Sequence, residues 1–196
     1  ISNIIDKNVV SKRVRSPITP IIIQGFGNIV YASVAFLVFK AVFSWEGLVL
    51  GFASAILGLL YFKALHLEEA SRVIAFYSII PLFVAVLAYF FLGETFGPEK
   101  YIGIILVVLG SLMISFKKKL MVTKAVPFLL VFVALYSVYF IGLKYSVDAR
   151  GIASIFASAS IGGFLGGSLL LIPYRTVLHK LRPKAIPLVL TSQLFG

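Results

Sequence analysis

Long apolar runs, separated by short charged segments, recur along this chain and restrict what it can fold into. Because a bilayer core of about 30 Å is crossed by roughly 20 helical residues, an apolar run of that length predicts a transmembrane helix. Membrane β-strands would be about ten residues long and would alternate polar with apolar side chains. Runs long enough for a helix occupy residues 18–39, 47–65, 70–92, 99–116, 124–146 and 151–173. We therefore predict an all-α, polytopic membrane helix bundle.

The composition supports a bilayer partner. Hydrophobic residues make up 60% of the 196 residues and charged residues 13%, against about 25% charged in a typical soluble domain. The basic residues behind the net charge of +11 punctuate the apolar runs and form no solvated face, so we expect no nucleic-acid partner. There is no cysteine, and His66 and His179 are far apart, so no metal site is predicted. No catalytic grouping indicates an enzyme, and we expect no cofactor.

Both ends of the chain lie in apolar sequence. The chain opens with "ISNII", which has the composition of the tail of a span, and residues 185–196 form an apolar run shorter than a span. We therefore expect a chain truncated at both ends.

The segment that follows residue 92 predicts a tight turn at the membrane interface. Gly93 and Gly97 bracket it, and Pro98 stands at the first position of the next helix, where proline is best tolerated. Glu94 and Glu99 lie near that helix N-terminus, where negative charge is favoured. The alternative role for Glu94 is that of a gating or coupling carboxylate.

Pro81 interrupts the run 70–92 in its middle. A proline inside a helix removes one hydrogen bond and costs about 3 kcal/mol, so we expect a helix kink at Pro81. In a membrane protein a serine hydroxyl can satisfy the carbonyl that is left without a donor, and Ser78 is placed one turn earlier. The kink is either a static feature of packing or a moving hinge.

Small residues recur at helical spacing in several runs. Such stripes let helix backbones approach closely, which is how helices pack in lipid without a hydrophobic driving force. We expect these contacts inside one bundle, and the alternative is the seam of a homodimer. The glycines expected at packing contacts are Gly51, Gly58, Gly103, Gly110, Gly162 and Gly166.

The stretch "YFKALHLEEASRVIAFYSIIPLFVAVLAYFFLGETFGPEKYIGIILVVLGSLMI" resembles the second half of an EamA repeat of the drug/metabolite transporter superfamily. A later stretch, "LLVFVALYSVYFIGLKYSV", is similar to the first helix of a second such repeat, with Lys144 near its end. The features that carry the first resemblance are Ala64-Leu65, Ala70-Ser71, the mid-helix Pro81, the ending Leu92-Gly93-Glu94, and Gly103 and Gly110 in the next helix.

The resemblance implies ten helices in two five-helix repeats, the second inverted because five is odd. This chain would hold the end of helix 1, helices 2 to 7 and the start of helix 8. Residues 1–118 would form the first repeat, without most of helix 1, and residues 119–196 the second, truncated in helix 8. The implied protein is a secondary transporter (a permease) for a small metabolite, amino acid or drug-like molecule, in the plasma (inner) membrane of a prokaryote.

Two alternatives stay open. A nucleotide-sugar or triose-phosphate type carrier of the same superfamily would need Lys or Arg in its cavity, and Lys63 is the nearest candidate. A non-transporting membrane scaffold would need no cavity. All seven acidic residues lie in loops or at span ends, so no carboxylate stands mid-membrane to carry a proton.

Polar side chains inside the spans are the candidates for a substrate cavity, since they are costly in lipid. The resemblance implies a cavity built largely from helices 3, 4, 8 and 9, which favours the first four candidates below. The alternative role is an interhelical hydrogen bond, worth about 0.6 kcal/mol on average, or, for tyrosines near span ends, a place in the interfacial belt. The candidates are Ser54, Tyr61, Tyr77, Ser78, Gln24, Asn28, Tyr31, Tyr136, Tyr139 and Gln193.

Two arguments about membrane orientation disagree. Most of the 18 Lys and Arg residues lie in the loops that follow residues 1–5, 47–65, 99–116 and 151–173. The positive-inside rule places these loops, including Lys117 to Lys119, in the cytoplasm. The resemblance implies the opposite orientation, with both termini cytoplasmic. We favour the charge bias, because it is large and spread over four loops.

Overall fold

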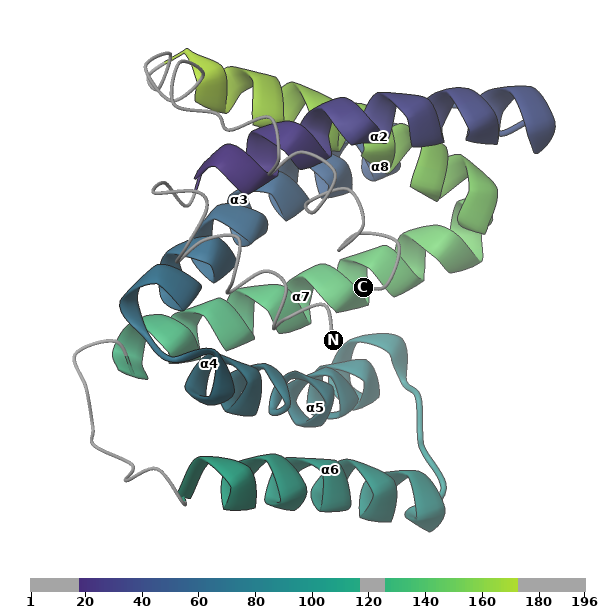
Figure 1. The fold of residues 1–196 in the computed structure, drawn as a ribbon. Coiled ribbons are helices and arrows are strands. Elements are labelled where there is room, and N and C mark those ends of the chain that lie inside the picture. Colours follow the sequence, from purple (N-terminus) through teal and green to yellow (C-terminus); the bar gives the residue numbers. More distant parts are fainter. Residues whose placement is uncertain (1–17, 117–125, 173–196) are drawn as a thin grey trace.

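The computed structural model describes residues 18–116 and 126–172, and these residues form helices joined by short turns (Figure 1). The helices follow the predicted runs, with the run 70–92 divided in two, so the predicted all-α class is confirmed. The apolar pieces at 1–5 and 185–196 lie outside the described residues. The helices are α2 (Ile18–Val38), α3 (Trp45–Leu67), α4 (Ala70–Tyr77), α5 (Ile80–Leu92), α6 (Pro98–Phe116), α7 (Val126–Arg150) and α8 (Ile152–Leu171).

Five helical segments in the described part of the chain are long and apolar enough to cross a membrane. They are Ile18–Val38, Trp45–Leu67, Arg72–Leu92, Val126–Arg150 and Ile152–Leu170. The predicted run 99–116 forms α6, which leaves large apolar side chains such as Ile102, Leu106 and Met113 exposed. Apolar surface of this kind is unfavourable in water but not in lipid. The chain is therefore a polytopic membrane helix bundle.

The helices are arranged around α7. In Figure 1, α2, α3 and α8 lie together above α7, the broken helix α4–α5 lies below it, and α6 lies farthest from the first group. The most extensive helix contacts are those of α8 with α2 and with α3, and α7 contacts both α3 and α5. Helix α7 therefore links the α2–α3–α8 group to α4 and α5.

Residues at the helix ends explain where two of the helices begin and stop. The Ser44 hydroxyl accepts a hydrogen bond from the Gly47 amide at 3.3 Å, which caps the N-terminus of α3. Gly93 ends α5 in the left-handed conformation, with φ of 66°, and the Glu94 amide donates to the Ala88 carbonyl at 3.2 Å. Only glycine adopts this conformation without a Cβ penalty, so the tight turn before Pro98 depends on Gly93.

Glycines allow α8 to approach α3 closely. A Cβ at Gly51 would overlap the Ala159 backbone, and one at Gly162 would overlap the Leu48 carbonyl. A Cβ at Gly166 would lie 2.6 Å from the Ala55 Cβ. These contacts are within one chain, as expected for packing inside a single bundle.

The other glycines expected at packing contacts are placed differently. A Cβ at Gly58 would meet only the Ile21 side chain, at 3.9 Å, which is an ordinary contact. At Gly103 and Gly110 a Cβ would meet nothing within 4 Å among the described residues. The expectation for Gly103 and Gly110 is therefore not met in this part of the chain, because α6 makes few contacts with the other described helices and both glycines are exposed.

The helix break lies just before Pro81. Helix α4 ends at Tyr77, and α5 begins at Ile80 with the proline in its first turn. Pro81 has no N–H to give to the Tyr77 carbonyl, four residues earlier. The Ser78 hydroxyl does not replace that donor, because it donates to the Ile74 carbonyl at 2.9 Å. The expectation that Ser78 compensates for the proline is wrong; its own i−4 carbonyl is simply the nearer acceptor.

Candidate functional site

A cleft of about 340 Å³ lies between α2, α3, α7 and α8, and each of these helices contributes one polar side chain to it. Asn28, Ser54 and Tyr139 are sequence candidates, whereas Ser160 was not singled out. The signal that could have found Ser160 is that it is a polar side chain inside the run 151–173. The apolar part of the wall consists of Leu143, Val147, Ile152, Ile155, Phe156 and Ala159.

The two serines of the cleft are already engaged with their own helices. The Ser54 hydroxyl donates to the Gly51 carbonyl at 2.6 Å, and the Ser160 hydroxyl donates to the Phe156 carbonyl at 2.9 Å. Each hydroxyl oxygen keeps lone pairs that accept further hydrogen bonds. The serines are therefore fixed in orientation and present acceptors to the cleft.

Asn28 and Tyr139 have unused hydrogen-bonding capacity. Neither the Asn28 amide nor the Tyr139 hydroxyl forms a hydrogen bond with another group in residues 18–116 and 126–172. Gly163 makes room for Asn28, since a Cβ there would overlap the Asn28 side-chain nitrogen. A partly buried polar group without a partner is costly in lipid, so these two groups need water or a bound molecule.

Three further tyrosine candidates pack against one another and do not line the cleft. The ring centroids of Tyr77 and Tyr136 are 5.4 Å apart, and those of Tyr61 and Tyr77 are 6.2 Å apart. Phe132 fills the centre of this aromatic cluster, 5.2 Å from Tyr136. Tyr139, 5.7 Å from Tyr136, joins the cluster to the cleft.

The remaining candidates lie elsewhere. Ser78 is in the helix break, and Gln24 is on α2 but not in the wall of the cleft. The Tyr31 ring packs edge-on against Phe156, one of the wall residues, at 6.4 Å. Gln193 lies outside the described residues. The structure thus brings three of the ten candidates together in one cleft.

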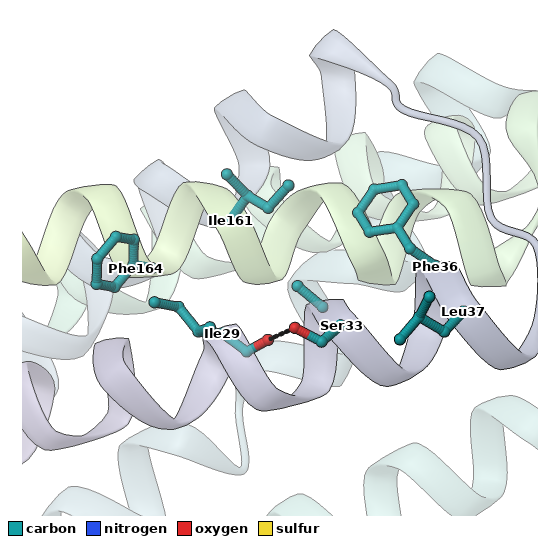
Figure 2. Close-up of a pocket in the computed structure, with 7 residues that line it drawn as sticks. Ile29, Ser33, Phe36, Leu37, Ile161 and Phe164 are labelled. Carbon is teal, nitrogen blue, oxygen red and sulfur yellow. Dashed lines mark hydrogen bonds between the residues drawn. The ribbon is translucent and has the colours of Figure 1, made fainter.

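A second hollow, of about 520 Å³, runs between α2 and α8. Figure 2 shows its lining, with Ile29, Phe36 and Leu37 on α2 and with Ile161 and Phe164 on α8. The polar side chain in this lining, Ser33, donates its hydroxyl proton to the Ile29 carbonyl at 2.9 Å. The hollow therefore offers few groups that could hydrogen-bond to a polar molecule, and the cleft beside Tyr139 is the better candidate site.

Charged side chains cluster at the end of the bundle that carries the turns 39–44 and 93–97. Lys144 of α7 pairs with Glu94 at 2.7 Å and lies 3.7 Å from Asp148. Arg150, at the end of α7, pairs with Glu46 of α3 at 2.9 Å. Sequence reasoning placed Glu94 at an interfacial turn, and the structure supplies its partner.

Lys63 does not reach the cleft. Its ammonium group lies 5.9 Å from the centre of the Phe128 ring, at the end of α3 remote from the turns 39–44 and 93–97. A cation held over an aromatic face is already partly compensated.

These helices define an integral, multi-pass membrane protein. The sequence model of the EamA-like transporter family matches residues 8–116, which is more than half of the chain. The chain therefore belongs to the EamA-like transporter family, within the drug/metabolite transporter superfamily. No curated protein and no solved structure shows significant similarity to it.

Proposed function

We propose that this protein is a secondary transporter that moves a small metabolite, amino acid or drug-like molecule by alternating access. The observation that supports this most directly is the cleft, where four helices each present an uncharged polar side chain: Asn28, Ser54, Tyr139 and Ser160. Its volume of about 340 Å³ lies in the range of small-molecule sites. Family membership supports transport but leaves the substrate open.

The chemistry of the cleft favours a net-neutral substrate with an apolar part. The described lining residues include no Lys, Arg, Asp or Glu, and more than half of them are apolar. Asn28 offers both donors and an acceptor, and Tyr139 offers a hydroxyl, so a hydrogen-bonding group fits between them. A phosphorylated substrate would require a cation, and Lys63 is held over Phe128 instead. This argues against a nucleotide-sugar or triose-phosphate carrier.

Thiol accessibility tests whether the cleft is a water-filled path. Because the chain has no cysteine, every introduced thiol is the sole target of a reagent. We expect Ser54→Cys and Asn28→Cys, in protein reconstituted into liposomes, to react with the charged reagent methanethiosulfonate ethylammonium. Leu106→Cys, on the exposed face of α6, is the control and is expected to stay unreactive in lipid. Protection of both cleft positions would contradict the proposal.

Transport itself is tested with a panel of labelled leucine, ethidium, UDP-glucose and glycerol 3-phosphate in the same liposomes. We expect saturable uptake of leucine, the net-neutral member of the panel, and its loss in Ser54→Trp, which fills the cleft. The exposed Ile105→Trp is the matched control. Uptake of a phosphorylated member would support the alternative carrier class, and uptake of none, with the cleft unreactive, would support a non-transporting scaffold.

A further inference from the structure

The ion pair of Lys144 joins two parts of the molecule that are far apart in sequence. Glu94 follows α5 and belongs to the segment matched by the family model, whereas Lys144 lies on α7, beyond that segment. Asp148, one turn further along α7, lies 3.7 Å from the same ammonium group. Lys144 is thus held between a carboxylate of its own helix and one from the α5–α6 turn.

The same helix carries the wall of the cleft on a neighbouring face. Tyr139, Leu143 and Val147 are spaced i, i+4 and i+8 on α7, and all three line the cleft. Lys144 and Asp148 are each one residue further on, which is about 100° around the helix. The ion pair is therefore attached to the same helix that forms part of the cleft wall, on the adjoining face.

On its other side, α8 is held firmly to the α3 end of the bundle. The buried Ser158 hydroxyl accepts a hydrogen bond from the Ser44 amide at 2.8 Å, and the Ser154 hydroxyl accepts one from the Val42 amide at 3.1 Å. The glycine contacts of Gly51 and Gly162 add backbone-to-backbone packing along the same two helices. This junction has no freedom to slide without breaking several contacts at once.

The α5 side is packed as well, since Ile80 of α5 is buried with Phe132 and Val133 of α7, but it contains a helix break. The helix break at Ser78 and Ile79 interrupts the backbone hydrogen bonding between α4 and α5, because Pro81 has no N–H, so this is the point about which α5 would tilt. At its far end, Lys144 is 43% exposed and Glu94 is 32% exposed. Ion pairs exposed to this extent contribute little and exchange readily with water. The contact is thus weak enough to open and close reversibly.

We propose that Lys144, with Glu94 and Asp148, is an ionic latch that holds the end of α5 against α7 and closes this end of the bundle. Opening of the latch lets α5 tilt about the break before Pro81, while α3 and α8 stay together. The inference rests on the proposed alternating-access transport and specifies its moving contact. In this proposal Glu94 takes the gating role that the sequence offered as the alternative to a purely interfacial turn.

Distance measurements between spin labels test the latch without any substrate. Labels at Phe91→Cys and Ile152→Cys, both exposed, report the end of α5 relative to the α7–α8 junction. We expect Glu94→Gln and Lys144→Gln each to raise the ratio of long to short distances about 1.5- to 5-fold, the range expected for an exposed pair. Reversing the charges with Glu94→Lys and Lys144→Glu, in an Asp148→Asn background, should restore the original ratio.

Two controls separate the latch from a general loosening. Labels at Val42→Cys, in the turn before α3, and at Ile152→Cys, at the start of α8, span the junction between that turn and α8, and their distance should not change in any variant. Glu99→Gln removes a neighbouring carboxylate that has no ion pair in the described part of the chain, and it should leave the distance from Phe91 unchanged.

The latch is refuted if Glu94→Gln and Lys144→Gln leave the distance from Phe91 unchanged, or if the Val42 pair shifts equally. Failure of charge reversal to restore the ratio would also overturn it. Because the readout is a distance, absence of transport in every variant would count against the proposed function and leave the latch standing.

Discussion

The glycine contact between α3 and α8 makes a sharp prediction about stability. A Cβ at Gly51 would lie 2.5 Å from the Ala159 carbonyl carbon and 2.6 Å from its Cα. Ordinary contact begins at about 3.4 Å, so Gly51→Ala must push the two helices apart by about 1 Å. Both obstructing atoms belong to the backbone, so no side-chain rotation relieves the overlap.

The magnitude follows from two opposing terms. Overpacking of a tight contact costs about 1–3 kcal/mol, whereas alanine is better than glycine in a helix by about 0.5–1 kcal/mol. Gly110→Ala on α6 gains the better helix propensity of alanine without the cost of overpacking, because no described atom lies within 4 Å of the added Cβ. The difference between the two variants therefore isolates packing, and we expect Gly51→Ala to be about 1–3 kcal/mol less stable than Gly110→Ala.

The assay is unfolding in mixed micelles of dodecyl maltoside and increasing sodium dodecyl sulfate. Trp45 is the one tryptophan of the chain and stands at the start of α3, so its fluorescence reports the α3–α8 junction. The midpoint should fall for Gly51→Ala and should hold or rise for Gly110→Ala. Equal midpoints would refute the close backbone contact, since the two substitutions share the same change in helix propensity.

Two further predictions concern the turns and the orientation. Gly93→Ala should lower stability by about 1–2 kcal/mol in the same assay, because φ of 66° disfavours any Cβ, although no described residue lies within 4 Å of it. Gly93→Asn should lose less stability, since asparagine tolerates this conformation better, and equal losses would contradict the role of the left-handed cap. The charge bias predicts that a protease site inserted at Lys117 to Lys119 stays uncut in intact cells and is cleaved in inverted vesicles. Cleavage from outside intact cells would instead support the orientation that the family resemblance implies, with both termini cytoplasmic.

Sequence reasoning located the helices well because the cause of each helix is local. Within a bilayer every backbone N–H and C=O must be satisfied inside its own segment, so an apolar run of sufficient length forms a helix whatever surrounds it. The same holds for the helix ends. Gly93 and Pro98 mark the turn between α5 and α6, and Pro81 marks the break, through their own backbone chemistry.

The candidate site was predicted only in part. Asn28, Ser54 and Tyr139 meet in the cleft, whereas Tyr61, Tyr77 and Tyr136 of the same candidate set pack into an aromatic cluster. Spacing along one helix shows which residues share a face but not what that face meets. The family's cavity helices favoured Tyr61 and Tyr77 and gave no weight to Tyr139, so the resemblance did not decide this either.

What the sequence determined by itself, then, is the set of membrane helices, their ends and the residues able to pack closely or to bind a polar group. The tertiary structure decided which of these found partners: it set Gly51 against α8, left Gly103 and Gly110 exposed, and joined Glu94 to Lys144. The physical reason is range. Helix formation depends on hydrogen bonds four residues apart, whereas contacts between helices depend on how faces from distant segments fit together, which no single segment encodes.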